Sequence, residues 1–170
     1  AHNLTGEGVA IAMVDSGFAF DAEIEQLLGS DVSQRFVKQV DFVGDGTCQG
    51  ETQDYVQHDG YCETGTSNSH DLYGHGTFLA SLIMNHYRDL ETGAPLGIAP
   101  GARLVSVRVL GDEGEGNYTD VIEGIQYVVA NNDILNIRVM NLSLVGQPST
   151  PYYFDPVNRA VEAAWRAGIV

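Results

Sequence analysis

Val9-Ala10-Ile11-Ala12-Met13-Val14-Asp15-Ser16-Gly17 is the stretch from which the architecture of this chain follows. Its residues 9–14 are apolar without interruption, and a turn sequence begins at Asp15. A run that is apolar on both faces predicts a central parallel strand covered by helices. Ligand-binding and catalytic groups gather at the carboxyl ends of such strands, which is where Asp15 stands. Asp15 is therefore a candidate functional residue, although an aspartate in this position can also simply cap a turn.

A second informative junction lies in Tyr73-Gly74-His75-Gly76-Thr77-Phe78-Leu79-Ala80-Ser81. Glycine on both sides of His75 allows a sharp backbone turn and lets another group approach closely. The apolar-rich run that follows predicts a helix from about His75 to Tyr87, with the imidazole in its first turn. His75 is then aimed at a partner. The alternative is a buried structural histidine at a loop–helix junction.

Strand-like and helix-like segments alternate through most of the chain. Apolar runs predict strands over residues 35–43, 102–110 and 137–144. A short helix or turn is predicted over 22–28, and helices are predicted over 120–131 with Thr119 as the cap and from Asp155-Pro156 up to Gly168. The pattern predicts a single α/β domain over residues 1–170, with a mainly parallel central sheet and helices on both faces.

The composition is that of a globular domain, with 44% hydrophobic and 18% charged residues in a chain of 170. The formal charge is −15, from 23 acidic and 8 basic residues, so neither nucleic acid nor an anionic membrane is expected as a partner. No apolar run approaches the ~20 residues that a membrane span requires. Ala1-His2-Asn3 does not resemble a signal peptide, so an exported protein would be present here in a mature or trimmed form.

Residues 44–71 break the alternation and form an acidic insertion. No Lys or Arg occurs between Lys38 and Arg88. Carboxylates without counter-charges repel one another, so structural calcium would stabilise the segment, and a solvated acidic loop is the alternative. The spacing is not that of an EF-hand, and no metal ligand is assigned. The acidic residues of the insertion are Asp45, Glu51, Asp54, Asp59, Glu63 and Asp71.

Cys48 and Cys62 flank a polar loop within this insertion. No second cysteine pair or dense histidine cluster supports a zinc site. A disulfide is predicted in preference to free thiols, and its loop of ~15 residues would contribute up to ~3 kcal/mol by the chain-entropy estimate. A disulfide also implies an oxidising compartment, and hence a secreted or extracellular protein, the periplasm included.

The ordered set of motifs resembles the subtilisin-like serine proteases (subtilases). Asp15-Ser16-Gly17 resembles that family's catalytic aspartate, and residues 74–80 resemble its catalytic histidine helix. The resemblance covers nearly the whole chain apart from the insertion, because residues 97–110, 114–118, 140–144 and 157–170 also match in the family's order. It implies the N-terminal portion of a subtilase catalytic domain. Asp15 and His75 would be two members of an Asp-His-Ser triad, which needs no cofactor.

The third member of that triad has no match in this sequence. The family places its serine, in a Gly-Thr-Ser motif, well after the histidine, so the nucleophile is expected C-terminal to Val170. Gly65-Thr66-Ser67 has the same letters but precedes His75. This chain alone should therefore be inactive, and the C-terminal remainder of the same protease, as a separate fragment, is an expected partner. The alternatives are a truncated chain and an inactive subtilase-fold binding or regulatory module.

The resemblance also implies a peptide-binding edge. Backbone groups of Gly114-Glu115-Gly116 and of Ser143-Leu144-Val145 would pair with an extended peptide or protein substrate. Tyr118 and Val121 match positions that shape a distal apolar subsite, with ordinary packing as the alternative. Val145 stands where the family usually has a glycine beside the specificity pocket. A nucleotide-binding domain is disfavoured, because the loop at 111–116 is acidic and lacks the G-x-G-x-x-G pattern. The sequence predicts a serine endopeptidase.

Overall fold

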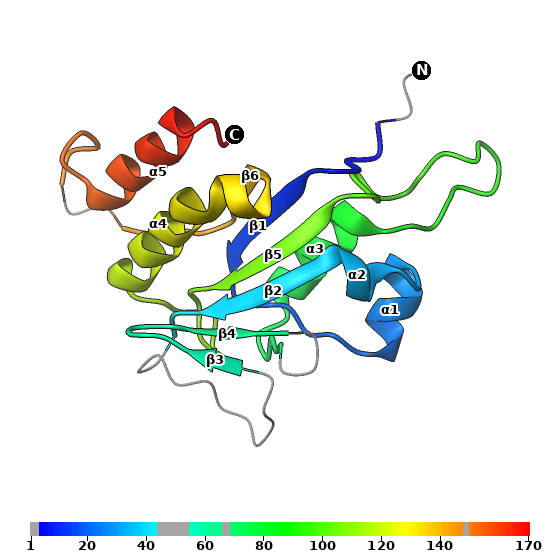
Figure 1. Cartoon of the computed structure of the whole chain (residues 1–170), viewed down its shortest axis with the longest axis horizontal. Coiled ribbons are helices and arrows are strands. Elements are labelled where there is room, and N and C mark those ends of the chain that lie inside the picture. The colour runs from blue at the N-terminus through cyan, green and yellow to red at the C-terminus, as the bar shows by residue number, and fades with distance from the viewer. Residues whose placement is uncertain (1–3, 44–54, 66–68, 148–149) are drawn as a thin grey trace.

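The computed structural model describes residues 4–43, 55–65, 69–147 and 150–170 (Figure 1). In chain order its elements are β1 (Ala10–Asp15), α1 (Ala22–Leu28), α2 (Val32–Arg35), β2 (Phe36–Asp41), β3 (Tyr55–Gln57), β4 (Cys62–Thr64), α3 (His75–Met84), β5 (Arg103–Arg108), α4 (Tyr118–Leu135), β6 (Ile137–Leu142) and α5 (Pro156–Arg166). The strands form one sheet in the order β3-β4-β2-β5-β1-β6. From β2 to β6 the neighbours are parallel, and β3 and β4 add an antiparallel hairpin beside β2. The predicted mainly parallel sheet is confirmed.

The strand β1 occupies the interior of the sheet, between β5 and β6. Every residue of β1 is buried. Its pairing with β5 runs from Ala10 opposite Arg103 to Asp15 opposite Arg108. A strand that is apolar on both faces is stable only when helices cover both faces. The continuous apolar run therefore sets the position of Asp15 at the carboxyl end of a fully buried strand.

Two helical layers cover the two faces of the sheet, as Figure 1 shows. One layer consists of α1, α2 and α3, which close a cluster that includes Met13, Phe18 and Leu104. The other consists of α4 and α5, which pack on a larger cluster that includes Val14 and Ile125. The prediction of helices on both faces is confirmed.

Local signals set the ends of two helices as predicted. The helix α1 has the predicted bounds, and Asp21 caps it by accepting hydrogen bonds from two backbone N–H groups. The helix α5 begins at Pro156, where the Asp155 carboxylate accepts from the N–H groups of Val157 (2.9 Å) and Asn158 (3.0 Å). It ends just before Gly168, whose φ of 83° places it in the left-handed region that stops a helix.

Two other helices end or begin elsewhere than predicted. The helix α4 begins at Tyr118 and runs to Leu135, so Thr119 lies inside its first turn and does not cap it. The helix α3 ends at Met84 and not at Tyr87, because Asn85 leaves the helical conformation and accepts a hydrogen bond from Gly97 N. In the described part of the chain, no helix combines the length and the apolar character needed to cross a membrane.

The acidic insertion contains regular structure that the sequence did not indicate. The strand β4 pairs with β2, and β3 pairs with β4. Glu63 on β4 has a counter-charge, because Lys38 Nζ lies 2.6 Å from its carboxylate and Tyr127 donates a second hydrogen bond at 2.7 Å. Burial alone would raise the pKa of Glu63, but these two partners outweigh it and hold that pKa below its usual value. The description of the segment as carboxylates without counter-charges is therefore wrong for Glu63. Asp45, Glu51, Asp54 and Cys48 lie outside the described residues.

Candidate active site

The Asp15 carboxylate is fully buried at the carboxyl end of β1. Its Oδ1 atom accepts hydrogen bonds from the backbone N–H of Ser16 at 2.7 Å and from the Ser16 hydroxyl at 3.2 Å. Among the described residues, its second oxygen, Oδ2, has no hydrogen-bond partner.

His75 is the first residue of α3 and faces Asp15. Gly74 precedes it in the left-handed region, with φ 87°, a conformation that glycine adopts without strain. The Nδ1 atom of His75 lies 2.8 Å from Asp15 Oδ1. A carboxylate can only accept, so Nδ1 carries the proton and Nε2 holds the free lone pair. The His75 side chain is 38% exposed, which leaves the ring accessible from the cleft described below.

A close backbone approach of α3 to the end of β1 makes this distance attainable. A Cβ atom placed on Gly76 would lie 2.2 Å from the carbonyl oxygen of Gly17. Gly76 N also donates a hydrogen bond of 3.0 Å to the hydroxyl of Ser16. The glycine after the histidine therefore lets the helix dock directly on the turn that follows Asp15.

Asp71 is a member of this site that the sequence reading missed. It is buried, and its carboxylate accepts hydrogen bonds from Gly74 N (2.8 Å), Thr77 N (2.8 Å) and the Thr77 hydroxyl (2.7 Å). Burial alone would raise the pKa of Asp71, but these hydrogen bonds outweigh it and hold the pKa below its usual value. The signal in the sequence was an aspartate shortly before a helix start, the spacing of a residue that caps the first turn.

The predicted substrate-binding residues lie together around one cleft of about 770 Å³. His75 and Tyr73 line one part of it, and residues of the loop before α4 and of the segment after β6 line the rest. Asp15 lies behind His75 and does not reach this cleft. The predicted residues that line it are Gly114, Glu115, Gly116, Tyr118, Ser143, Leu144 and Val145, together with Val121.

Two residues that line the cleft, Tyr118 and Val145, differ in their surroundings. Tyr118 donates a hydrogen bond of 3.2 Å to the second carboxylate oxygen of Asp155, the residue that caps α5. The Val145 side chain, which replaces the glycine expected beside the specificity pocket, is fully exposed. The start of α4 and the cap of α5 are thus joined beside the cleft, and Val145 also lines it.

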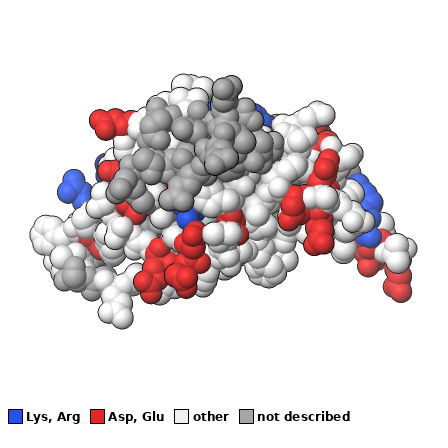
Figure 2. Space-filling model, turned by 90° about the horizontal axis from the view of Figure 1, so that it is seen from below, with Lys and Arg blue, Asp and Glu red and all other residues white. Residues whose placement is uncertain are grey.

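The described residues contain no group of three or more His, Cys, Asp or Glu side chains placed to hold a metal ion. Figure 2 shows the acidic side chains of one face in separate groups over the surface. Asp71, one of the acids of the insertion, is already occupied by three donors, and Glu63 is paired. These two acids are therefore engaged by other partners, and the structural calcium that the sequence suggested stays a prediction.

In this α/β domain a buried aspartate at a strand end contacts a histidine beside a cleft. Hydrolases that use an Asp-His pair to activate a nucleophile have this arrangement. The model of the subtilase family matches residues 6–168 of this chain. The chain therefore belongs to the subtilase family, which bears out the resemblance of its motifs.

Similar proteins include the serine protease AprX of Bacillus subtilis (strain 168), which is 31% identical over 172 residues that cover 98% of this chain and 32% of AprX. A subtilisin-like protease of Coccidioides posadasii (strain C735) is 30% identical over 167 residues, 96% of this chain and 32% of that protein. Subtilisin DY of Bacillus licheniformis is 34% identical over 107 residues, 63% of this chain and 35% of subtilisin DY. The chain thus spans about a third of the length of these relatives.

Proposed function

We propose that the protein is a serine endopeptidase in which Asp15 and His75 are two members of an Asp-His-Ser triad. The observation that carries this is the 2.8 Å contact between His75 Nδ1 and Asp15 Oδ1, with the histidine ring open to the cleft. In this proposal the chain is the N-terminal portion of the catalytic domain, and the serine is contributed by sequence C-terminal to Val170. Within the described part of the chain, no serine hydroxyl is hydrogen-bonded to His75.

The chemistry follows from the tautomer that the aspartate imposes. Nε2 of His75 removes the proton from the serine hydroxyl as that oxygen attacks the scissile carbonyl carbon. The resulting imidazolium is stabilised by the buried carboxylate of Asp15, which remains ionised. The same Nε2–H then protonates the leaving amine, so that the histidine is restored as the acyl-enzyme forms. Water completes the cycle by hydrolysing the ester with His75 again as the base.

The substrate in this proposal is an extended peptide that adds as a strand along the cleft. Residues 114–116 line the cleft and would pair with the peptide backbone on one side, and residues 143–145 would pair with it on the other. A Cβ atom on Gly114 would lie 2.4 Å from the Tyr73 ring, so glycine at this position lets Tyr73, which also lines the cleft, pack against the edge. Tyr118 and Val121 would contact a side chain of the substrate farther from the bond that is cut.

The test is substitution of the histidine in the full-length protein. His75→Ala should lower kcat for peptide hydrolysis by several orders of magnitude, on the order of 10⁴-fold or more, because the base and the acid are lost together. His86→Ala is the matched control, since His86 contacts Leu27 O and lies outside the cleft. A His75→Ala protein that still cleaved peptides at a comparable rate would show the triad assignment to be wrong.

The nucleophile is located by a second measurement on the same protein. A fluorophosphonate that labels activated serines should modify one serine beyond Val170 in the wild type and none in His75→Ala. Intact mass shows at the same time whether that serine belongs to a separate polypeptide, as expected for a nicked protease. A wild-type protein that neither reacts nor cleaves would instead be a subtilase-fold binding or regulatory module.

The remaining expectations belong to this proposal as well. The protein would act outside the cytoplasm, secreted or in the periplasm, because a Cys48–Cys62 disulfide needs an oxidising compartment. Catalysis would require no cofactor. Structural calcium is a further possible ligand in this proposal, to be tested by the effect of a chelator on the melting temperature.

A further inference from the structure

The carboxyl ends of three neighbouring strands place Asp41, Arg108 and Asp15 in one row. Arg108 pairs in register with Asp15 of β1 on one side and with Asp41 of β2 on the other. Paired residues of parallel strands project to the same face of a sheet, so these three side chains share one face. Only Asp15 has a role in the proposed triad. The other two residues therefore need an explanation of their own.

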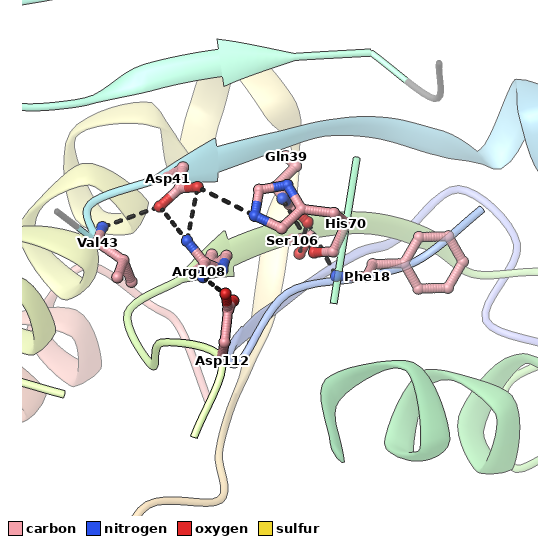
Figure 3. Close-up of polar contacts among 8 residues, drawn as sticks. All are labelled: Phe18, Gln39, Asp41, Val43, His70, Ser106, Arg108 and Asp112. Atoms are coloured by element: carbon pink, nitrogen blue, oxygen red, sulfur yellow. Dashed lines mark hydrogen bonds and ion pairs between the residues drawn. The ribbon is translucent and has the colours of Figure 1, made fainter. Parts of the chain in front are cut away.

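The guanidinium of Arg108 is buried and held from two directions, as Figure 3 shows. Its Nη1 atom donates to both carboxylate oxygens of Asp41, at 3.1 and 2.9 Å. Its Nη2 atom donates to Asp112 Oδ1 at 2.9 Å. Asp41 is fixed in turn by Val43 N at 2.8 Å and lies 3.8 Å from His70 Nε2. A planar guanidinium with a carboxylate at each end has one orientation, which a lysine could not reproduce.

The stem of Arg108 packs under the turn that follows Asp15. A Cβ atom on Gly17 would lie 3.2 Å from Arg108 Cδ and 3.3 Å from Gln39 Oε1. Gln39 accepts a hydrogen bond of 2.8 Å from Phe18 N and another of 3.1 Å from the Ser106 hydroxyl (Figure 3). The position of Arg108 is therefore tied to the strand that carries the triad aspartate.

Asp112 lies in the loop 111–116, which ends in the predicted substrate-binding edge. The backbone hydrogen bonds of this loop are internal: Gly111 N donates to Glu115 O at 2.8 Å, and Gly114 N donates to Gly111 O at 2.9 Å. Across the described ranges, the Arg108–Asp112 pair is the only ion pair or side-chain hydrogen bond between this loop and the rest of the domain. A loop with three glycines has much conformational entropy to lose when a peptide binds.

We propose that Arg108 is a positioning residue that holds the substrate-binding edge against the strand of Asp15. The ion pair with Asp112 orders the loop before the peptide arrives, so that binding does not have to supply the ordering free energy. The inference rests on the proposed function, because it assigns a role within the peptide-binding edge. Loss of the pair should weaken the binding of extended peptides, while the chemistry at the Asp15–His75 pair continues at its own rate.

The experiment compares Asp112→Ala with the wild type in the full-length protein. Asp112 is half exposed, so its removal leaves the buried Arg108–Asp41 pair in place. For a four-residue peptide p-nitroanilide that reaches residues 114–116, KM should rise about tenfold, equivalent to ~1.4 kcal/mol, with kcat within about twofold. For a single-residue p-nitrophenyl ester, neither constant should change. Asp133→Ala, which breaks the exposed Asp133–Arg138 pair at the far end of α4, is the control.

A second variant, Arg108→Lys, should raise KM for the four-residue peptide in the same direction as Asp112→Ala.

A second readout does not depend on catalysis. Amide hydrogen exchange at Gly111 and Gly114 should be about tenfold faster in Asp112→Ala, because local opening of the loop becomes easier. Unchanged exchange together with an unchanged KM would overturn the inference, as would equal losses for the peptide and the ester. If the wild type hydrolyses neither substrate, the proposed function fails. The exchange measurement then still decides whether Arg108 orders the loop.

Discussion

Asp71 shows how one buried carboxylate can organise a catalytic turn without contacting the reacting atoms. It accepts from the backbone of Gly74 and Thr77, the residues on either side of His75–Gly76, and Thr77 Oγ1 accepts in turn from Ala19 N at 2.9 Å. The turn that carries the histidine is thereby tied to the segment that follows β1. Without that carboxylate these part-buried donors would lose their acceptor, at a total cost of about 1–3 kcal/mol.

The stability contributed by Asp71 should depend on pH in a defined direction. Its pKa in the folded state lies below the ordinary value, about 3.9 in an unfolded chain. The contribution is therefore complete above about pH 4 and is lost as the pH falls through the lower, folded-state pKa. Asp71→Asn should lower the free energy of unfolding by about 1–3 kcal/mol at pH 7, and the difference from the wild type should shrink at pH 3.

Urea unfolding of both proteins at the two pH values measures this difference. Glu162→Gln, which removes an exposed pair with Arg166 on α5, is the control and should change stability by less than about 0.5 kcal/mol. A gap between wild type and Asp71→Asn of equal size at pH 7 and pH 3 would mean that the charge of Asp71 is not what stabilises the turn.

At the scale of elements, the site depends on how closely α3 docks on β1. Gly76→Ala would place a methyl carbon 2.2 Å from the Gly17 carbonyl oxygen, so the helix must move away. We expect a loss of about 1–3 kcal/mol in stability, as for other overpacked contacts. A larger fractional loss of kcat should accompany it, because a shift of about 1 Å in catalytic geometry costs on the order of 10²-fold.

The matched control for this prediction is Gly65→Ala. Among the described residues, a Cβ atom at Gly65 meets no atom within 4 Å, so both stability and kcat should stay close to the wild type. If Gly76→Ala kept the wild-type kcat, the close approach of α3 to β1 would not be what sets the Asp15–His75 distance.

The elements that could be predicted are those whose signals are local. The run before Asp15, the bounds of α1 and the Asp155-Pro156 start of α5 all follow from short stretches of sequence. The hairpin of β3 and β4 could not be predicted this way, because β4 is a strand only when paired with β2, more than twenty residues earlier in the chain. The start of α4 was misplaced because Asn117 occupies the cap position without a side-chain hydrogen bond, while Thr119 carries the usual signal.

The residues of the site also differ in whether local sequence could predict them. Asp15 and His75 each stood at a recognisable junction, so the pair could be identified, and the resemblance to the family placed them in order. The 2.8 Å between them could not be inferred from either stretch alone, since it requires Gly76 to lie against Gly17 in the fold. Asp71 was counted with the acids of the insertion because nothing in the sequence separates a buried acceptor from a surface charge.

At the scale of the whole molecule, three neighbouring strands carry buried charged residues at their carboxyl ends. Apolar residues fill both faces of β1, and the carboxyl ends of β2, β5 and β1 carry the row of Asp41, Arg108 and Asp15. The helices α3 and α4 begin near this end, so the histidine turn and the loop before α4 both lie beside it (Figure 1). Catalytic orientation and peptide binding thus depend on one set of strand ends.

The hairpin edge of the same sheet is where a disulfide should add stability. Cys62 is fully buried on β4 and lies opposite Asp41 of β2, so a bridge to Cys48 would anchor the insertion to the edge of the sheet. Closing a loop of this length should raise the free energy of unfolding by up to ~3 kcal/mol.

Thiol counting and unfolding measure this effect. We expect no reactive thiol in the unfolded, unreduced protein and two after reduction, with a lower unfolding midpoint in the reduced form. Cys48→Ser should match the reduced wild type in stability and no longer respond to reductant. Two reactive thiols before reduction, with equal electrophoretic mobility before and after it, would show that the cysteines are unpaired and would remove the argument for an oxidising compartment.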